Sequence, residues 1–324
     1  MLDILNILAP ILLIVALGAV LRWRFHTDLA TLSKLNIHVL VPAFIFDKVS
    51  HSKLLWGEMG GIVFVTALNV MLLGAVVLLV GRAAGAARKP LAAAALGVMF
   101  YNSGNYGLPL AELAFGGRGG AAQAFVLMTM NVLTFTVGLS IAAGASGRGI
   151  LRGLLDLLKM PILPALAGGV LAKMWLDSDG ANQIPRGLDK TIGYLSDGLV
   201  PVALLTLGTQ LAIRPRWPRW RPVSLVLVLR LLYAPAQMAV ILWGLSLVFG
   251  WLGRPGWMSG LDLWPWPAVL LVLTAAVPTA INTLLLTLEM GGDAELAADS
   301  VFWTTIGSCL TIPLWIWAAR AVLH

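Results

Sequence analysis

Ten apolar segments, each about as long as a membrane-spanning helix, divide this chain of 324 residues. They cover residues 4–22, 32–50, 58–80, 91–115, 121–143, 155–175, 188–212, 223–249, 267–289 and 298–321. The chain is 59% hydrophobic and only 11% charged, whereas soluble domains are about a quarter charged. Because short loops join the segments, the sequence predicts an all-α integral membrane protein with ten transmembrane helices.

Basic residues concentrate on one side of these segments. Thirteen of the 22 lysines and arginines lie in the loops that follow the first, third, fifth and seventh segments, eight lie on the other side, and Arg230 lies inside a segment. Short loops rich in lysine and arginine stay in the cytoplasm, so both termini are predicted to face the periplasm. The net charge of +7 is explained by these loops, and no nucleic-acid partner is predicted.

Patterns that support catalysis or metal binding are missing from the sequence. The single cysteine, Cys309, lies in an apolar segment, and the four histidines do not cluster. The chain contains no HExxH motif, no Walker loop and no paired catalytic carboxylates. We therefore expect no enzyme, metal site, cofactor or ATP-driven pump.

The two halves of the chain resemble each other segment by segment. PILLIVALGAVLR from Pro10 aligns with PILPALAGGVLAK from Pro161 at an offset of 151, and LVPAFIF aligns with LVPVALL at 159. The fourth and ninth segments align at 177, which places Asn105 opposite Asn282. Matches in the same order indicate a duplication. Since each copy has an odd number of segments, residues 1–147 and 148–324 are predicted to be two inverted five-helix repeats.

Two corresponding segments are interrupted by residues that break a helix. The fourth contains YNSGNYGLPL from Tyr101, and the ninth contains AAVPTAIN with Pro278 in its middle. Broken helices are tolerated in a membrane where they line a cavity, and in inverted repeats the breaks of both copies meet near the midplane. Helices 4 and 9 are therefore predicted to cross at a polar pocket. Free N–H groups and positive helix ends there favour a carboxylate.

These features together resemble the auxin efflux carrier family over nearly the whole chain. Asn102 followed by Gly-Leu-Pro five residues later is similar to the family's crossover pattern, and YLSDGLVPVALLTLGTQLAIRPR is similar to its Ser-Asp, Leu-Gly and Pro-Arg order. Arg230 with a proline five residues on, and Pro278 with Glu289 at the segment end, follow in the same order. The family includes plant auxin exporters and bacterial carriers of malate- or malonate-like acids.

The resemblance implies a secondary transporter of small organic carboxylate anions, with efflux of auxin-like or malate- and malonate-like acids. It also implies a scaffold of helices 1, 2, 6 and 7 that forms a homodimer in the lipid membrane. Helices 3–5 and 8–10 would form a transport domain that moves as an elevator. The connection Ser146 to Leu154 is short and lacks the hydrophilic loop of the plant members, so a prokaryotic inner-membrane protein is expected.

Polar and helix-breaking residues in these segments have functional and structural interpretations. The predicted substrate contacts are Asn102, Asn105 and Asn282, and the residues predicted to shape the breaks are Gly104, Gly107, Pro109 and Pro278. The asparagines can instead cap broken backbone or join two helices, since membrane interfaces use amides in that way. The pairs Gly116-Gly117 and Gly291-Gly292 are predicted turns.

Three charged residues are candidates for ion coupling or for a charge pair. Asp197 lies inside the seventh segment, and an embedded acid is a functional hypothesis by default. Glu112 follows the first break and is expected near an interface. Arg230 is expected to snorkel toward the cytoplasmic surface, with pairing to an acid or an anion as the alternative.

Two other classes of protein remain open at this point. A sodium- or proton-coupled symporter or antiporter of the bile acid symporter type would use Asp197 or Glu112 in coupling. Sodium-dependent uptake would distinguish it from a uniporter. A membrane enzyme or sensor without transport would instead lack any substrate flux.

Overall fold

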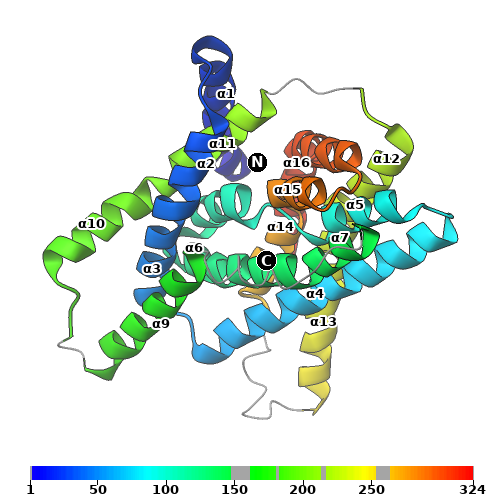
Figure 1. Cartoon of the computed structure of the whole chain (residues 1–324). Coiled ribbons are helices and arrows are strands. Elements are labelled where there is room, and N and C mark those ends of the chain that lie inside the picture. Colours follow the sequence, from blue (N-terminus) through cyan, green and yellow to red (C-terminus); the bar gives the residue numbers. More distant parts are fainter. Residues whose placement is uncertain (1, 147–160, 180–181, 213–216, 253–262, 324) are drawn as a thin grey trace. The chain divides into compact units, whose positions relative to one another are not determined.

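The computed structural model describes residues 2–146, 161–179, 182–212, 217–252 and 263–323, and this part of the chain is helical (Figure 1). Within these ranges the only β-pairing is an isolated bridge between Tyr101 and Thr279. Six of the described helices are long and apolar enough to span a membrane. They are Leu29–Ser50, Trp56–Ala83, Ser103–Gly144, Arg186–Leu211, Trp220–Val248 and Ala294–Ala318. The predicted all-α class is therefore confirmed, and the helices are those of a multi-pass membrane protein.

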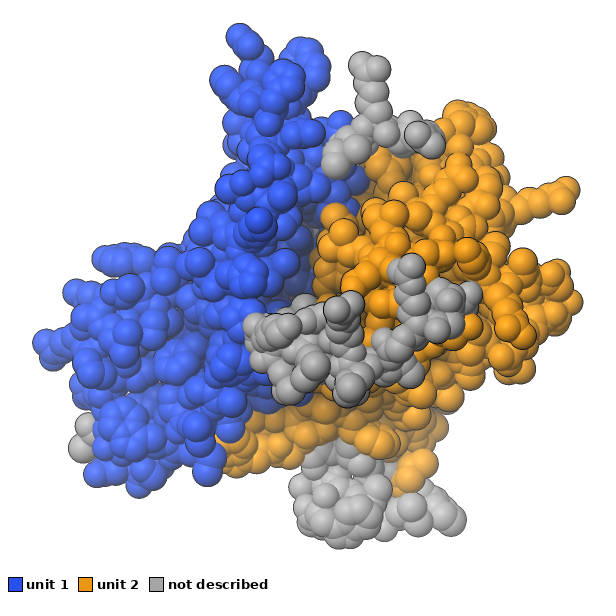
Figure 2. All heavy atoms as spheres, in the orientation of Figure 1, with its two compact units in different colours: residues 1–54, 104–128, 158–214 blue, residues 55–103, 129–157, 215–324 orange. Residues whose placement is uncertain are grey.

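The helices belong to two compact units, coloured blue and orange in Figure 2. Unit 1 comprises Met1–Leu54, Gly104–Met128 and Leu158–Arg214, and unit 2 comprises Leu55–Ser103, Thr129–Leu157 and Pro215–His324. Unit 1 contains α1 (Leu2–Phe25), α2 (Leu29–Leu35), α3 (Val41–Ser50), α9 (Ile162–Ser178), α10 (Arg186–Asp197) and α11 (Leu199–Leu211). Unit 2 contains α4 (Trp56–Ala83), α5 (Arg88–Met99), α7 (Leu139–Ser146), α12 (Trp220–Val228), α13 (Ala234–Leu252), α14 (Ala268–Ala275), α15 (Ile281–Glu289) and α16 (Ala294–Leu323). Helix α6 (Leu108–Leu133) contributes residues to both.

Local chemistry explains where some helices begin and turn. Asp28 caps α2, because its carboxylate accepts hydrogen bonds from the N–H groups of Ala30 and Thr31 at 3.2 and 2.9 Å. Hydrogen bonds from the Thr31 hydroxyl and then from its backbone lower the pKa of Asp28. Gly116 has φ +63° and Gly291 has φ +66°, a left-handed backbone that glycine adopts without strain. The turns predicted at these glycines are confirmed, although α6 continues past the bend at Gly116.

Unit 1 is built on two sets of closely packed helices. Helix α1 packs along α11, and α3 packs against α9 and α10. A Cβ atom added to Gly208 of α11 would lie 2.8 Å from the backbone carbonyl carbon of Val15 in α1. Small residues at such a contact allow two backbones to approach closely, so Gly208 sets the spacing of α1 and α11.

Replacing Gly208 by alanine is therefore expected to destabilise the protein by about 1–3 kcal/mol, because the added methyl group meets backbone that cannot rotate away. Gly193 of α10 is the matched control, since a Cβ atom there has no neighbour within 4 Å. Thermal unfolding in detergent measures the difference. A Gly208→Ala protein as stable as Gly193→Ala would contradict the packing of α1 on α11.

Unit 2 surrounds two short helices, α5 and α14. Helix α5 packs against α4, α7 and α16, while α14 packs against α13 and α16. Helices α4 and α13 are joined by Gln237, whose Nε2 donates to Oδ1 and to the carbonyl oxygen of Asn69 at 2.8 and 3.0 Å. Both short helices end inside the unit, at the two breaks predicted from the sequence.

Candidate functional site

The chain leaves α5 and α14 as two extended segments that pair with each other in unit 2. The N–H of Asn102 donates to the carbonyl oxygen of Pro278 at 2.7 Å, and the N–H of Ala280 donates to that of Phe100 at 3.0 Å. These two hydrogen bonds flank the antiparallel bridge of Tyr101 with Thr279. We call residues 100–102 and 278–280 the paired breaks.

Prolines explain where α14 ends and where α6 begins. Pro278 has no N–H to donate, and proline disfavours helical backbone at the preceding residue, Val277. After the first break a π-helical stretch, Ser103–Gly107, leads into α6, and Pro109 occupies the first turn of α6, where its missing N–H is not needed. The pairing gives some of the freed backbone groups hydrogen-bond partners, as a membrane interior requires.

Threonines of unit 2 fix the second break in place. The Thr279 hydroxyl donates to the carbonyl oxygen of Gly97 in α5 at 2.7 Å. The N–H of Thr279 donates to the Thr304 hydroxyl of α16 at 3.0 Å. Thr279 and Thr304 are fully buried. The paired breaks are therefore a rigid, polar element within an apolar unit.

The predicted asparagines lie in different parts of the structure. Asn102 belongs to the paired breaks and is 7% exposed, and Asn282 lies in the first turn of α15, directly after the second break. Asn105 belongs to unit 1, where its Oδ1 accepts a hydrogen bond from Nδ2 of the buried Asn36 at 2.8 Å. Asn102 is thus bonded to the second break through its backbone N–H, whereas Asn105 is bonded to Asn36, the first residue of the π-helical stretch Asn36–Leu40 after α2. Substrate contact by any of them stays a prediction.

The four residues predicted to shape the breaks lie at or beside them. Gly104 and Gly107 belong to the π-helical stretch, Pro109 to the start of α6, and Pro278 to the paired breaks. Gly104 and Gly107 do not have positive φ angles, so they are not needed for left-handed backbone. A Cβ atom on Gly104 would come no closer than 3.7 Å to Leu127, an ordinary contact.

The structure contradicts the expectation that the Arg230 side chain extends to the cytoplasmic surface. It lies in a π-helical stretch between α12 and α13, and none of its surface is exposed. Its Nη1 donates to the carbonyl oxygen of Val98 at 2.6 Å, and its Nη2 donates to that of Ala275. The guanidinium also lies over the Tyr101 ring, 4.9 Å from the ring centre. The expectation is wrong because the ends of α5 and α14 bind the side chain from inside unit 2.

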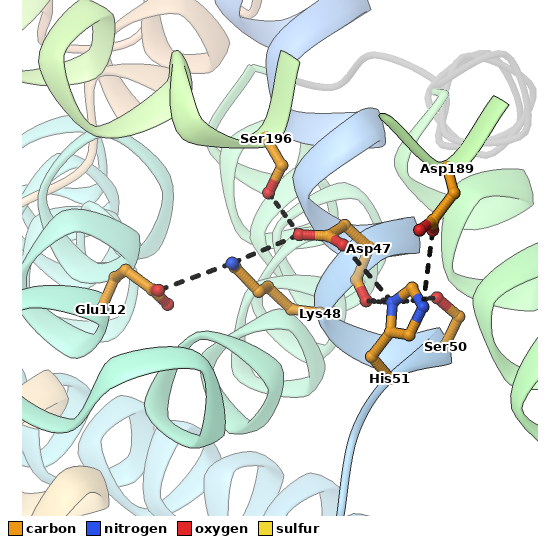
Figure 3. Close-up of polar contacts among 7 residues, drawn as sticks. All are labelled: Asp47, Lys48, Ser50, His51, Glu112, Asp189 and Ser196. Atoms are coloured by element: carbon orange, nitrogen blue, oxygen red, sulfur yellow. Dashed lines mark hydrogen bonds and ion pairs between the residues drawn. The ribbon is translucent and has the colours of Figure 1, made fainter. Parts of the chain in front are cut away.

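A second polar cluster lies in unit 1, around the end of α3 (Figure 3). Asp47 accepts a hydrogen bond from the Ser196 hydroxyl at 2.7 Å, and Lys48 Nζ lies 3.2 Å from Asp47 and 3.6 Å from Glu112. His51 lies 3.4 Å from Asp47 and 3.5 Å from Asp189. The cluster joins α3, α6 and α10 through charged groups in a membrane-spanning part of the chain.

Glu112 and Asp197 have different positions relative to this cluster. Glu112 pairs with Lys48 through Oε1, while its Oε2 is buried and has no hydrogen-bond partner within the described residues. Asp197, expected to be embedded, is exposed at the end of α10. Its neighbour Ser196 makes the contact with Asp47 instead. Glu112 therefore belongs to the cluster, whereas Asp197 is exposed.

The sequence alone did not identify the residues that form the paired breaks or the polar cluster at the end of α3. No sequence pattern distinguishes Tyr101 and Thr279 from other residues of apolar segments. The pair Asp47 and Lys48 is typical of the end of a helix. Asp47 and Ser196 are 149 positions apart in the chain. For the paired breaks, the internal repeat was the available signal, because its offset of 177 aligns Asn102 with Thr279.

Comparison with known proteins agrees with these observations. Residues 157–316 match the family described as Membrane transport protein. An "Uncharacterized transporter" of Methanothermobacter thermautotrophicus is 28% identical over 313 residues, which cover 94% of this chain and 95% of that protein. A "Putative malonate transporter" of Rhizobium meliloti is 26% identical over 220 residues, covering 65% of this chain and 62% of that protein. The comparisons indicate a membrane transporter and not an enzyme. In agreement with the resemblance to auxin efflux carriers, the second half of the chain thus resembles a family of membrane transport proteins.

Proposed function

We propose that the protein is a secondary transporter of small organic carboxylate anions, and that the paired breaks are part of its substrate site. The observation that carries the proposal is the backbone pairing of residues 100–102 with 278–280 inside a buried helical unit. Irregular backbone at membrane depth is found where a protein builds a binding site or a water-filled cavity. The match to a family of membrane transport proteins supports a transporter, and a relative named as a putative malonate transporter supports the carboxylate class.

The chemistry of the breaks suits a carboxylate. Helix α15 begins directly after the second break, so the N–H groups of its first turn have no partners in their own helix. The positive end of this helix favours a negative charge. Asn102 and Asn282 add amide donors without a fixed charge that would slow release. Pro278 shapes the backbone of the second break.

Packing within unit 1 supports the inverted five-plus-five repeat of residues 1–147 and 148–324. A Cβ atom on Gly18 would meet the backbone of Leu205, and one on Gly169 would lie nearest to the Val49 side chain, at 3.1 Å, and 3.4 Å from Cα of Phe46. Gly18 and Gly169 are 151 positions apart, and Phe46 and Leu205 are 159 apart, the two offsets of the sequence alignment. The contact of α1 with α11 is thus repeated by that of α9 with α3, as a two-fold relation of the repeats requires.

The division into units supports the proposed elevator mechanism. Unit 1 contains the helices of segments 1, 2, 6 and 7, the scaffold set, and unit 2 contains most of segments 3–5 and 8–10, the transport set. Residues 104–128 depart from this division, since they belong to unit 1. We propose a homodimer through the scaffold helices, because α1 exposes a row of apolar side chains to lipid or to a second copy. They are Leu12, Leu13, Leu17, Val20 and Trp23.

A ligand panel tests the proposed function. Purified protein is heated with malonate, malate, indole-3-acetate and other mono- and dicarboxylates, each beside its neutral amide. We expect at least one carboxylate to raise the unfolding temperature while its amide does not, because a ligand that binds the native state stabilises it. Equal shifts with acid and amide, or no shift with any acid, would count against a carboxylate site.

A coupled symporter is the second candidate, and Glu112 is the observation that favours it. A buried carboxylate oxygen without a partner in the described residues, beside Lys48, is a candidate proton or sodium carrier. Glu112→Gln is expected to remove any dependence of uptake on pH or sodium while leaving uptake itself measurable. Initial uptake rates at several pH values and sodium concentrations check this. If wild-type uptake is indifferent to both, the protein is a uniporter.

The membrane orientation is part of the same proposal, with both termini in the periplasm of a cell inner membrane. A cysteine in place of Arg88 should then react with maleimide only after the cells are permeabilised. The other basic position considered for this test, Arg216, lies outside the described residues. Labelling at position 88 by an impermeant maleimide in intact cells would reverse the orientation.

A further inference from the structure

We propose that Arg230 is the positioning residue of the paired breaks: it binds the ends of both half-helices and makes the site favourable for an anion. The second part of this inference rests on the proposed carboxylate transport. In this proposal Arg230 does not contact the substrate and acts through the backbone carbonyl groups that it binds. The role of Arg230 is both geometric, through the carbonyl groups it binds, and electrostatic, through its charge.

The geometric step concerns the two carbonyl groups that Arg230 binds. Val98 lies in the last turn of α5, and Ala275 is the last residue of α14, so both carbonyl groups are among those that a helix end leaves without a partner. They are 177 positions apart, the offset that aligns segments 4 and 9. One guanidinium therefore binds equivalent carbonyl groups of the two repeats. An arginine fork can do this because its two terminal nitrogens are held in one plane, whereas a lysine has a single nitrogen.

The electrostatic step concerns the charge of Arg230. The side chain is fully buried, and it makes no ion pair within the described part of the chain. Each helix C-terminus carries roughly half a negative elementary charge, so the ends of α5 and α14 together balance one arginine. Without Arg230 the two negative ends would face the paired breaks and repel an anion. With it, the positive N-terminal end of α15 is left to attract one.

Stability alone does not account for this arrangement. A buried charge costs free energy that its contacts only partly return, and well-packed apolar residues often replace such groups without loss. Arg230 Nε is also buried and has no hydrogen-bond partner among the described residues. An incompletely satisfied cation at the centre of unit 2 is the pattern of a residue kept for function.

Hydrogen exchange tests the geometric step without any substrate. The readout is the exchange of peptides that contain the amides of Asn102 and Ala280, which form the two backbone hydrogen bonds of the paired breaks. Arg230→Met is expected to speed this exchange about tenfold or more, and Arg230→Lys to speed it less, because an amide exchanges through local opening. Arg219→Met is the matched control, since Arg219 lies in the same unit but pairs with Asp293 in an exposed contact. Unchanged exchange in both Arg230 variants would overturn the proposal.

Affinity for an anion relative to a neutral analogue tests the electrostatic step. Malonate and malonamide are the probes, and the ratio of their dissociation constants is compared between variants. We expect Arg230→Met to lower the preference for malonate about tenfold and Arg230→Lys to keep it, because the lysine retains the charge. A purely structural role would alter turnover or stability and leave this ratio unchanged, and that result would overturn the electrostatic step. If wild-type protein binds neither probe, the carboxylate proposal fails for malonate, while hydrogen exchange still decides whether Arg230 positions the breaks.

Discussion

Replacing Asn102 by alanine is expected to weaken carboxylate binding about 10- to 150-fold, because a hydrogen bond to a charged group contributes about 1.5–3 kcal/mol. Asn102 is 7% exposed and its backbone N–H, which pairs with Pro278, is retained in the variant. The fold should therefore survive. Binding is measured by titration of purified protein with the carboxylate that gives the largest thermal shift.

Asn102→Asp is the sharper change at the same position. It keeps the size of the side chain but places a negative charge beside the carboxylate, so transport should be abolished more completely than by alanine. Pro278→Ala should act differently, lowering turnover through the shape of the break more than affinity. Asn182→Ala is the control, since Asn182 lies in an exposed segment and donates to the carbonyl oxygen of Trp175. If both Asn102 variants bind and transport like the control, Asn102 is a structural amide.

A covalent link between the two compact units is expected to abolish transport. In the proposed elevator, unit 2 moves past unit 1 with its substrate, and a crosslink that joins the units stops this movement while leaving ligand binding intact. Cysteine pairs with one member in each unit are introduced into a Cys309→Ser background and screened for crosslinking in membranes. Flux is then measured before and after reduction.

The control for this experiment is a crosslink inside one unit. Arg219 and Asp293, which pair at 2.6 Å in unit 2, can both be replaced by cysteine and joined by a short reagent. That link should leave flux unchanged. Full flux in protein whose units are completely crosslinked would exclude the elevator and leave a rocking or local-gating mechanism.

The breaks could be predicted from the sequence because they depend on local rules. Pro278 cannot donate to a helix, and the glycines of NSGNYGLP weaken one because they lose more backbone freedom on folding than other residues. The repeat offset of 177 indicated that the two breaks correspond, and the structure pairs them through Asn102 and Pro278. The turns at Gly116 and Gly291 followed from the same kind of local reasoning.

The role of Arg230 could not be predicted, since its position along a helix does not reveal which backbone surrounds it. Its distance from the segment end suggested a path to the surface, but the carbonyl groups of Val98 and Ala275 come from two other helices. Asp47 and Ser196 also come together only through tertiary packing. The π-helical stretches, such as Leu229–Tyr233 around Arg230, leave no pattern in the sequence that we could identify.

The most direct test of the central claim is carboxylate exchange in proteoliposomes. Wild-type protein is reconstituted with internal malonate, and entry of external radiolabelled malonate is followed over time, with Asn102→Asp and Asn182→Ala in parallel. We predict saturable exchange by wild type and by Asn182→Ala, and none by Asn102→Asp. Exchange by Asn102→Asp at the wild-type rate, or no exchange of malonate or any carboxylate of the panel by folded wild-type protein, would contradict a carboxylate carrier built on the paired breaks.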